Sequence, residues 1–273
     1  MNIKVKVSDK VTLSNNMPVS VIAGPCVIEN RTETINLAKN LKKICDDRKI
    51  KFIFKASYDK ANRSSIDSFR GLGIEEGLEI LSEIKKTLKV PVLTDVHSVS
   101  EVNIVAKVVD MIQIPAFLCR QTDLIVACAK TGLPINIKKG QFLAPEDMNQ
   151  VLKKAKVSGN NNLTLTERGA SFGYHNLVVD FRSIEIMKQF GYPVIFDATH
   201  SVQKPGGLGD KSGGDRQFVL PLAKAATAVG IAAIFVEVHK NPQQALSDGA
   251  NSIDLNMFKN MLKTVCALDA VVK

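Results

Sequence analysis

The chain has 273 residues, a length that suits one large domain or two ordinary ones. Hydrophobic residues make up 45% of it, enough for a large core, but runs such as 230–238 are too short to cross a membrane. The net charge is +9, yet aromatic residues are only 5% and tryptophan is absent, which argues against a nucleic-acid-binding surface. The first ten residues lack the continuous apolar stretch of a signal peptide, so we expect a cytoplasmic protein. Five cysteines without CxxC spacing argue against a disulfide framework.

Short β-rich runs alternate with longer amphipathic stretches along the chain. A hairpin formed by 3–7 and 11–13 is expected first. The expected strands are 19–24, 51–56, 90–96, 111–115, 135–138, 163–167, 192–198 and 233–239. The expected helices are about 32–48, 74–88, 99–107, 121–131, 145–156, 181–190, 216–229 and from 253 onwards.

This eightfold alternation predicts an α/β fold, a single (β/α)8 TIM barrel over residues 1–273. We expect the hairpin within 1–14 to cap the bottom of the barrel. An open doubly wound sheet is the rival architecture, and it is less favoured because it would need no particular number of strands. Segment 201–215, SVQKPGGLGDKSGGD, has five glycines and is predicted to be a mobile loop on the active-site side.

In such a barrel, catalytic groups lie at the carboxyl ends of the strands. Each expected strand ends in a polar or ionisable group, which a purely structural barrel would not need. In chain order these candidates are Cys26, Lys55, Ser57, Lys60, Asn62, Arg63, Ser64, Asp95, His97, Gln113, Lys138, Arg168, His200, Glu237 and Asp248.

Four cations among these candidates are expected to converge on one mouth of the barrel, where an anion must offset their repulsion. They are Lys55, Lys60, Lys138 and Arg168. A phosphate or a carboxylate is the natural guest. Arg63 with Ser64 forms a second candidate anion site, although an ordinary helix-capping turn explains that segment equally well. Two such sites suggest two phosphorylated substrates.

Four other candidates form a ligand set for a divalent transition metal: Cys26, His200, Glu237 and Asp248. Glu237 lies inside the apolar run IFVEVH, where a carboxylate is costly to bury without a metal or another cation. That makes Glu237 the strongest single functional signal. Cys26 alone would more often be a buried structural thiol than a ligand.

Nine sequence blocks in the same order identify a known family. They are AGPCVIEN (23–30), FKASYDKANRSS (54–65), TDVH (94–97), QIPAFLCRQTDL (113–124), NIKKGQFLAP (136–145), ERGASFGY (167–174), FDATHSVQ (196–203), SGGDR (212–216) and FVEVHKNPQQALSDGAN (235–251). Through them the chain resembles 3-deoxy-D-manno-octulosonate 8-phosphate synthase over nearly its full length.

The resemblance implies a reaction for lipopolysaccharide biosynthesis. Phosphoenolpyruvate condenses with D-arabinose 5-phosphate and water, giving the 3-deoxy octulosonate phosphate and inorganic phosphate. In such enzymes the enol carbon attacks the aldehyde, water adds at C2 and phosphate leaves by C–O cleavage. Lys60, Lys138 and Arg168 match the family's phosphoenolpyruvate-binding cations, with Lys55 and Gln113 beside them. Asn62, Arg63 and Ser64 match its arabinose 5-phosphate motif, and Ser57 is a further predicted substrate-binding residue. The resemblance also implies a homotetramer, with the sugar-phosphate site completed across a subunit boundary.

The family has metal-dependent members with Cys at position 26 and metal-independent members with Asn there. This chain has Cys26 and keeps the other three ligands, which implies one divalent ion, Zn²⁺, Fe²⁺, Mn²⁺ or Co²⁺. The ion would orient and polarise the aldehyde or a water. The resemblance assigns catalytic roles to Lys55, Lys60, Asp95, His97 and His200, with the proton-transfer steps left open.

Three alternatives compete with this interpretation. The related 3-deoxy-D-arabino-heptulosonate 7-phosphate synthase uses erythrose 4-phosphate, but carries a KPRTS-type segment where this chain has Asn62. A basic nucleic-acid-binding protein would explain the net charge but not Glu237. A Schiff-base aldolase could use Lys55 or Lys138, which lie on strands as such a lysine should.

Overall fold

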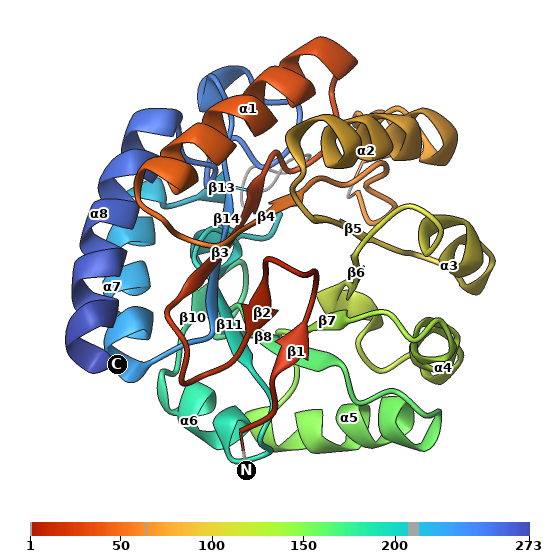
Figure 1. Cartoon of the computed structure of the whole chain (residues 1–273), viewed down its shortest axis with the longest axis vertical. Coiled ribbons are helices and arrows are strands. Elements are labelled where there is room, and N and C mark those ends of the chain that lie inside the picture. Colours follow the sequence, from red (N-terminus) through yellow and green to blue (C-terminus); the bar gives the residue numbers. More distant parts are fainter. Residues whose placement is uncertain (1, 64, 207–212) are drawn as a thin grey trace.

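The structure, a computed structural model, describes residues 2–63, 65–206 and 213–273. Eight parallel strands close into a barrel, and helices surround it on the outside (Figure 1). Around the barrel the strands are β3 (Ser20–Gly24), β4 (Phe52–Lys55), β5 (Val92–Asp95), β6 (Met111–Ile114), β7 (Ile135–Lys138), β8 (Leu163–Glu167), β11 (Val194–Asp197) and β14 (Ala233–Glu237), which pairs back with β3. The predicted TIM barrel is confirmed, and the open sheet is wrong.

One α-helix follows each barrel strand. The helices are α1 (Arg31–Asp47), α2 (Ile74–Leu88), α3 (Val99–Val105), α4 (Thr122–Lys130), α5 (Met148–Val157), α6 (Arg182–Lys188), α7 (Val219–Val229) and α8 (Leu255–Val272). The fifth and seventh begin three residues later than the sequence predicts. Pro145–Asp147 and Arg216–Phe218 form 3₁₀ turns before them, as often happens at helix N-termini. Asn30 caps α1 by accepting a hydrogen bond from the Glu33 amide at 2.9 Å.

The hairpin at the start of the chain closes the bottom of the barrel. Strand β1 (Val5–Lys6) pairs antiparallel with β2 (Thr12–Leu13), and Val5 faces Leu13 in the register. Figure 1 shows this hairpin in front of the barrel opening. Val7, Val11 and Leu13 pack with residues on the inner wall of the barrel, including Ile53. This apolar plug fills the lower interior, so the polar strand ends gather at the opposite mouth.

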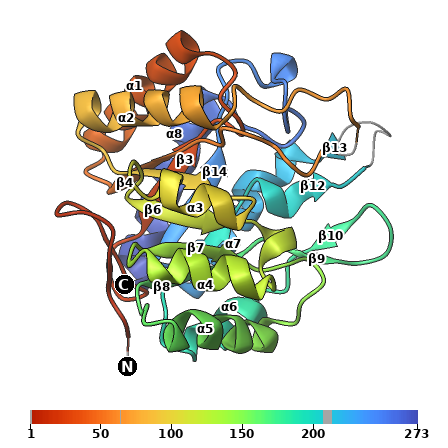
Figure 2. The same cartoon turned by 90° about the vertical axis from the view of Figure 1, so that its right-hand side faces the viewer.

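Two short antiparallel ribbons stand at that opposite mouth, on the far side from the N-terminal hairpin (Figure 2). One joins β9 (Ala170–Ser171) to β10 (Leu177–Val178), and the other joins β12 (Gln203–Lys204) to β13 (Gly213–Gly214). Short strands near both ends of the predicted loop 201–215 are therefore a feature that the sequence does not predict. Two-residue strands leave too little hydrophobic alternation to be seen in a sequence. Residues 207–212 lie outside the described part, and the mobility of the segment stays a prediction.

None of the helices in the described ranges has both the length and the apolar character needed to pass through a lipid bilayer.

Candidate active site

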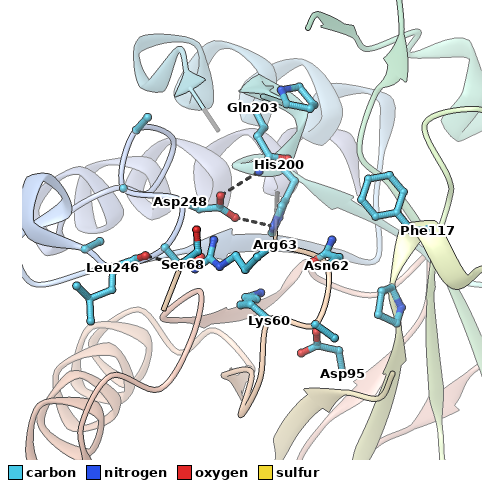
Figure 3. Close-up of a pocket in the computed structure, with 18 of the residues that line it drawn as sticks. Lys60, Asn62, Arg63, Ser68, Asp95, Phe117, His200, Gln203, Leu246 and Asp248 are labelled. Carbon is cyan, nitrogen blue, oxygen red and sulfur yellow. Dashed lines mark hydrogen bonds and ion pairs between the residues drawn. The ribbon is translucent and has the colours of Figure 1, made fainter. Parts of the chain in front are cut away.

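A cavity of about 1090 Å³ opens at the carboxyl ends of the barrel strands. Figure 3 shows side chains from several loops pointing into it. The predicted site residues on its wall are Lys55, Lys60, Asn62, Arg63, Asp95, His97, Gln113, Lys138, Arg168, His200 and Asp248. Cys26, Ser57 and Glu237 are buried just behind the wall. Ser64 lies outside the described residues. The barrel thus brings nearly all the described candidates to one place.

Three of the predicted metal ligands, Cys26, Glu237 and Asp248, gather around one point, and His200 lies beside two of them. One donor atom each from Cys26, Glu237 and Asp248 lies within 4.8 Å of the other two. His200 Nε2 is 3.5 Å from Glu237 Oε1 and 3.6 Å from Asp248 Oδ2. Cys26 comes from the loop after β3, Glu237 ends β14, and the other two lie in the loops that follow β11 and β14. Strand ends separated by more than 200 residues meet here because β14 pairs with β3.

Asp197 fixes the orientation of the His200 ring. His200 Nδ1 lies 2.7 Å from Asp197 Oδ2, which also accepts a hydrogen bond from Lys138. Since an ionised carboxylate only accepts, His200 donates from Nδ1 to Asp197 and turns Nε2 toward Glu237 and Asp248. Burial opposes ionisation of Asp197, but His200 and Lys138 hold its pKa well below the usual value. A carboxylate behind a histidine in this manner is the usual support of a metal-ligating imidazole.

Glu237 is fully buried, and it remains charged. Burial raises the pKa of this carboxyl, but His200, Lys55 and Lys60 outweigh that effect and lower it to about 2. Lys55 Nζ donates to Glu237 Oε1 at 3.0 Å and to the Cys26 carbonyl at 2.9 Å. The second oxygen, Oε2, has no hydrogen-bond partner in the described part of the protein. A buried carboxylate oxygen left without a donor is costly, and a cation would satisfy it.

The donor set fits a divalent transition metal. Burial, reinforced by Asp248 and Glu237, raises the pKa of the Cys26 thiol well above its ordinary value. Cys26 Sγ lies 2.8 Å from Ser247 Oγ and 3.4 Å from Asp248 Oδ2, so a neutral thiol has partners there. A thiolate at this position needs a strong positive charge beside it, which a bound ion supplies. Soft sulfur, an imidazole nitrogen and two carboxylates suit Zn²⁺, Fe²⁺, Mn²⁺ or Co²⁺.

A cationic wall faces the cavity beside this cluster. Burial lowers the pKa of Lys138 to about 8; Asp197 opposes this effect, and Lys55 and Arg168 add to it. Burial also lowers the pKa of Arg168. Arg168 Nη1 is buried with no hydrogen-bond partner among the described residues. An anion in the cavity would satisfy that nitrogen and stabilise both charges.

The Lys138 ammonium also lies over an aromatic face. Its Nζ is 3.3 Å from the centroid of the Phe235 ring, which lies on the inner wall of the barrel. The ring face attracts the cation and limits its movement. Lys138 is therefore held in place by Asp197 and Phe235 before any ligand binds.

His97 sits between two carboxylates at the end of β5. Its Nε2 is 3.2 Å from Asp95 Oδ2, and its Nδ1 is 3.4 Å from Glu101 Oε2. Burial lowers the pKa of His97, but the hydrogen bond and charge of Asp95 outweigh it and the pKa is raised. Ser57 donates to Asp95 from the side away from the cavity. Ser57, predicted to bind substrate, thus supports Asp95 from behind the cavity wall.

Asn62 and Arg63 lie on the opposite wall, in the loop after β4. Arg63 Nε donates to the Phe69 carbonyl at 3.0 Å, and Nη2 donates to the Leu246 carbonyl at 3.3 Å. Figure 3 shows Arg63 spanning between these two loops. Gln113 accepts from Asn136 at 3.0 Å on the wall nearest β6. The predicted second anion site therefore lies across the cavity, with Arg63 bonded to backbone carbonyls.

Comparison with known sequences places the chain in a family. Residues 2–273 match the profile described as the DAHP synthetase I family. The chain belongs to the DAHP synthetase I family. It is 57% identical over 263 residues to a protein of Geotalea daltonii, covering 96% of this chain and 97% of the relative. It is 59% identical over 253 residues to a protein of Trichlorobacter lovleyi, covering 93% of each. A Cyanothece protein is 54% identical over 266 residues, covering 97% of each. All three are named 2-dehydro-3-deoxyphosphooctonate aldolase.

Three residues of this DAHP synthetase I site were not among the predicted site residues: Asp197, Gln203 and Ser247. Asp197 had a detectable signal, since it ends a strand three residues before His200. Gln203 and Ser247 had none. Their contacts, to Asp248 and Cys26, span 45 and 221 positions and depend on loop conformation.

Proposed function

We propose that this chain condenses phosphoenolpyruvate with D-arabinose 5-phosphate and water, giving 3-deoxy-D-manno-octulosonate 8-phosphate and inorganic phosphate. The name carried by its relatives, 2-dehydro-3-deoxyphosphooctonate aldolase, supports this reaction, and the heptulosonate alternative is not favoured. The observation that carries the proposal is a cavity in which buried cations stand beside the three donors Cys26, Glu237 and Asp248, with His200 next to them. The product class implies a role in lipopolysaccharide biosynthesis.

The cationic wall would bind phosphoenolpyruvate. Lys138 and Arg168 are buried, and the free Nη1 of Arg168 offers a donor to a phosphate or carboxylate oxygen. Lys60 enters from the loop after β4, and neighbouring negative groups outweigh its burial and raise its pKa, so it stays charged. These groups would hold the anion in line with the aldehyde and stabilise the departing phosphate. Arg63 and Asn62, across the cavity, would receive the sugar phosphate.

One divalent ion would be held by Cys26, His200, Glu237 and Asp248. When bound, the ion supplies Lewis-acid polarisation of the aldehyde or of a water. The chain contributes the orientation: Asp197 aligns His200, and Lys55 neutralises Glu237. His97, whose pKa is raised by the hydrogen bond and charge of Asp95, would supply a proton to the oxygen formed from the aldehyde.

We also propose a cytoplasmic homotetramer. Exposed aromatic side chains near the cavity mouth support an interface between copies: Phe117 on the cavity wall is 51% exposed, and Phe172 and Tyr174 on the β9–β10 ribbon are 72% and 96% exposed. Clustered exposed aromatics commonly mark a surface that another protein covers. Sedimentation should give four times the chain mass, and a monomer at micromolar concentration would contradict the assembly.

A phosphate-release assay tests the function. The protein is supplied with phosphoenolpyruvate and either arabinose 5-phosphate or erythrose 4-phosphate. We expect faster turnover of the five-carbon sugar, loss of activity on chelation and recovery with a divalent metal. Faster turnover of erythrose 4-phosphate would overturn the substrate assignment. Full activity after verified metal removal would overturn the metal assignment alone. Borohydride trapping should give no adduct, which separates this chemistry from a Schiff-base aldolase.

A further inference from the structure

Gln203 connects the metal-ligand cluster to the cationic wall. Its Nε2 donates to Asp248 Oδ1 at 3.0 Å, and its Oε1 accepts from Arg168 Nη2 at 3.0 Å. Figure 3 shows Gln203 and His200 both beside Asp248, with dashed lines to its carboxylate. Gln203 is the first residue of β12, and its side chain lines the cavity. One side chain therefore touches a residue of each of the two proposed binding sites.

An amide suits this connection because it both donates and accepts. A carboxylate such as Asp248 accepts hydrogen bonds, while a guanidinium such as Arg168 donates them. The bridging group must therefore donate at one end and accept at the other. A carboxylate at position 203 would repel Asp248, and an ammonium would repel Arg168. The two hydrogen bonds also fix which way the Gln203 amide is turned.

The bridge determines what each partner offers to a ligand. With Oδ1 of Asp248 engaged by Gln203, the other oxygen, Oδ2, is the one near Cys26 Sγ and His200 Nε2. With Nη2 of Arg168 engaged, Nη1 is left without a partner among the described residues. Gln203 therefore occupies Oδ1 of Asp248 and Nη2 of Arg168. Oδ2 of Asp248 is left to face the metal-ligand cluster, and Nη1 of Arg168 is left to bind an anion.

The loop that carries Asp248 needs such support. Asp248 has φ of +50°, in the left-handed region that a residue with a side chain seldom adopts. The ribbon holds this loop at two further points. Arg216 donates to the Gly249 carbonyl, and a Cβ on Gly214 would come within 2.8 Å of Asn251 Cβ. Only glycine allows β13 to approach the loop so closely.

We propose that Gln203 is a positioning residue that couples metal binding at Asp248 to anion binding at Arg168. With an ion bound, Asp248 would be held through Oδ2, its Oδ1 would orient the Gln203 amide, and the amide would orient Arg168 for phosphoenolpyruvate. Each ligand then binds more tightly when the other is present, and the factor is the same from either side. This inference rests on the function proposed above.

The test measures coupling in the absence of turnover. Phosphoenolpyruvate binding to the full chain is measured by calorimetry, without arabinose 5-phosphate, in the metal-free protein and in the Co²⁺-loaded protein. Co²⁺ binding is followed separately by its thiolate absorption, with and without phosphoenolpyruvate. The variant is Gln203→Met, which keeps the length of the side chain and loses both hydrogen bonds. Gln203→Asn, which is polar but too short to span both partners, replaces it if the methionine variant does not fold. Gln243→Met, at an exposed position on the cavity wall, is the matched control.

We expect Co²⁺ to tighten phosphoenolpyruvate binding in the unaltered protein and in the Gln243 control. The coupling is the ratio of the phosphoenolpyruvate dissociation constants of the metal-free and the Co²⁺-loaded protein. In Gln203→Met this ratio should fall at least about threefold toward one, since two charge-assisted hydrogen bonds are lost. Attraction between the ion and the anion through space leaves a residual ratio above one. An unchanged ratio, even with weaker binding of both ligands, means a merely structural Gln203 and overturns the coupling. If the unaltered protein fails to bind phosphoenolpyruvate in either form, the proposed function fails instead.

Discussion

The substitution Asp197→Asn tests how Asp197, which orients the predicted metal ligand His200, controls the site. Asp197 Oδ1 accepts from the backbone amides of Thr199 and His200 and from the Thr199 hydroxyl, while Oδ2 accepts from Lys138 and His200 Nδ1. An asparagine oxygen would stay with the first group of donors. Its NH₂ would then face the Lys138 ammonium and His200 Nδ1, placing donor against donor. His200 would move its proton to Nε2, the nitrogen that faces the metal-ligand cluster.

The expected magnitude follows from burial. Asp197 is fully buried, so water does not replace the lost interactions. Loss of the carboxylate behind a metal-ligating histidine costs roughly 10- to 100-fold in metal affinity, about 1.4–2.8 kcal/mol. Breaking a buried ion pair costs roughly 3–5 kcal/mol of stability. Because Lys138, with a pKa of about 8, can release its proton, we expect a loss near the lower end, about 3 kcal/mol. This loss should shrink as pH rises through 8, where Lys138 becomes neutral in the unaltered protein.

Metal affinity is measured by competition with a chromophoric chelator, and stability by urea unfolding of the metal-free protein. Asp95→Asn is the matched control, because Asp95 is a buried carboxylate at the end of β5, across the barrel from β11, and its partners are Ser57 and His97. We expect it to change metal affinity less than about twofold. Equal metal affinities for Asp197→Asn and the unaltered protein would refute the argument that Asp197 sets the His200 tautomer.

Three further outcomes follow from the structure. Binding of phosphoenolpyruvate by the metal-free protein should weaken as pH rises through about 8, since Lys138 loses its charge there; calorimetry from pH 7 to 9.5 checks this, and Lys138→Arg should flatten the profile. Lys55→Met should destabilise the metal-free protein by roughly 3–5 kcal/mol, because Glu237 loses its 3.0 Å partner in the buried interior; the destabilisation in urea should be smaller with metal bound, and an unchanged midpoint would contradict the pairing. Leu13→Ala, at the apolar plug below the site, should cost roughly 2–5 kcal/mol in unfolding experiments while kcat/KM stays within about twofold, and a large fall in kcat/KM with the fold intact would show that the plug and the site are linked.

The sequence alone determined the barrel and the chemistry that it gathers. Hydrophobic periodicity is a local property, so eight strand–helix units could be read directly and their order left one closed arrangement. Burial of Glu237 within IFVEVH also follows from local sequence, because a barrel strand has no exposed face there. The convergence of Cys26 with Asp248 needed one further rule, that parallel strands deliver their carboxyl ends to the same mouth.

Tertiary structure decided how these groups divide their hydrogen bonds. Oδ1 of Asp197 accepts from backbone amides of the following turn, and Oδ2 accepts from Lys138 and His200. Hydrophobic periodicity does not predict which oxygen takes which donor. Gln203 reaches both Asp248 and Arg168 because a two-residue ribbon holds it beside the cavity. Such contacts depend on loop conformations, and side-chain and backbone partners distant in the chain set those conformations. The hydrophobic periodicity of a strand does not predict which partners these are.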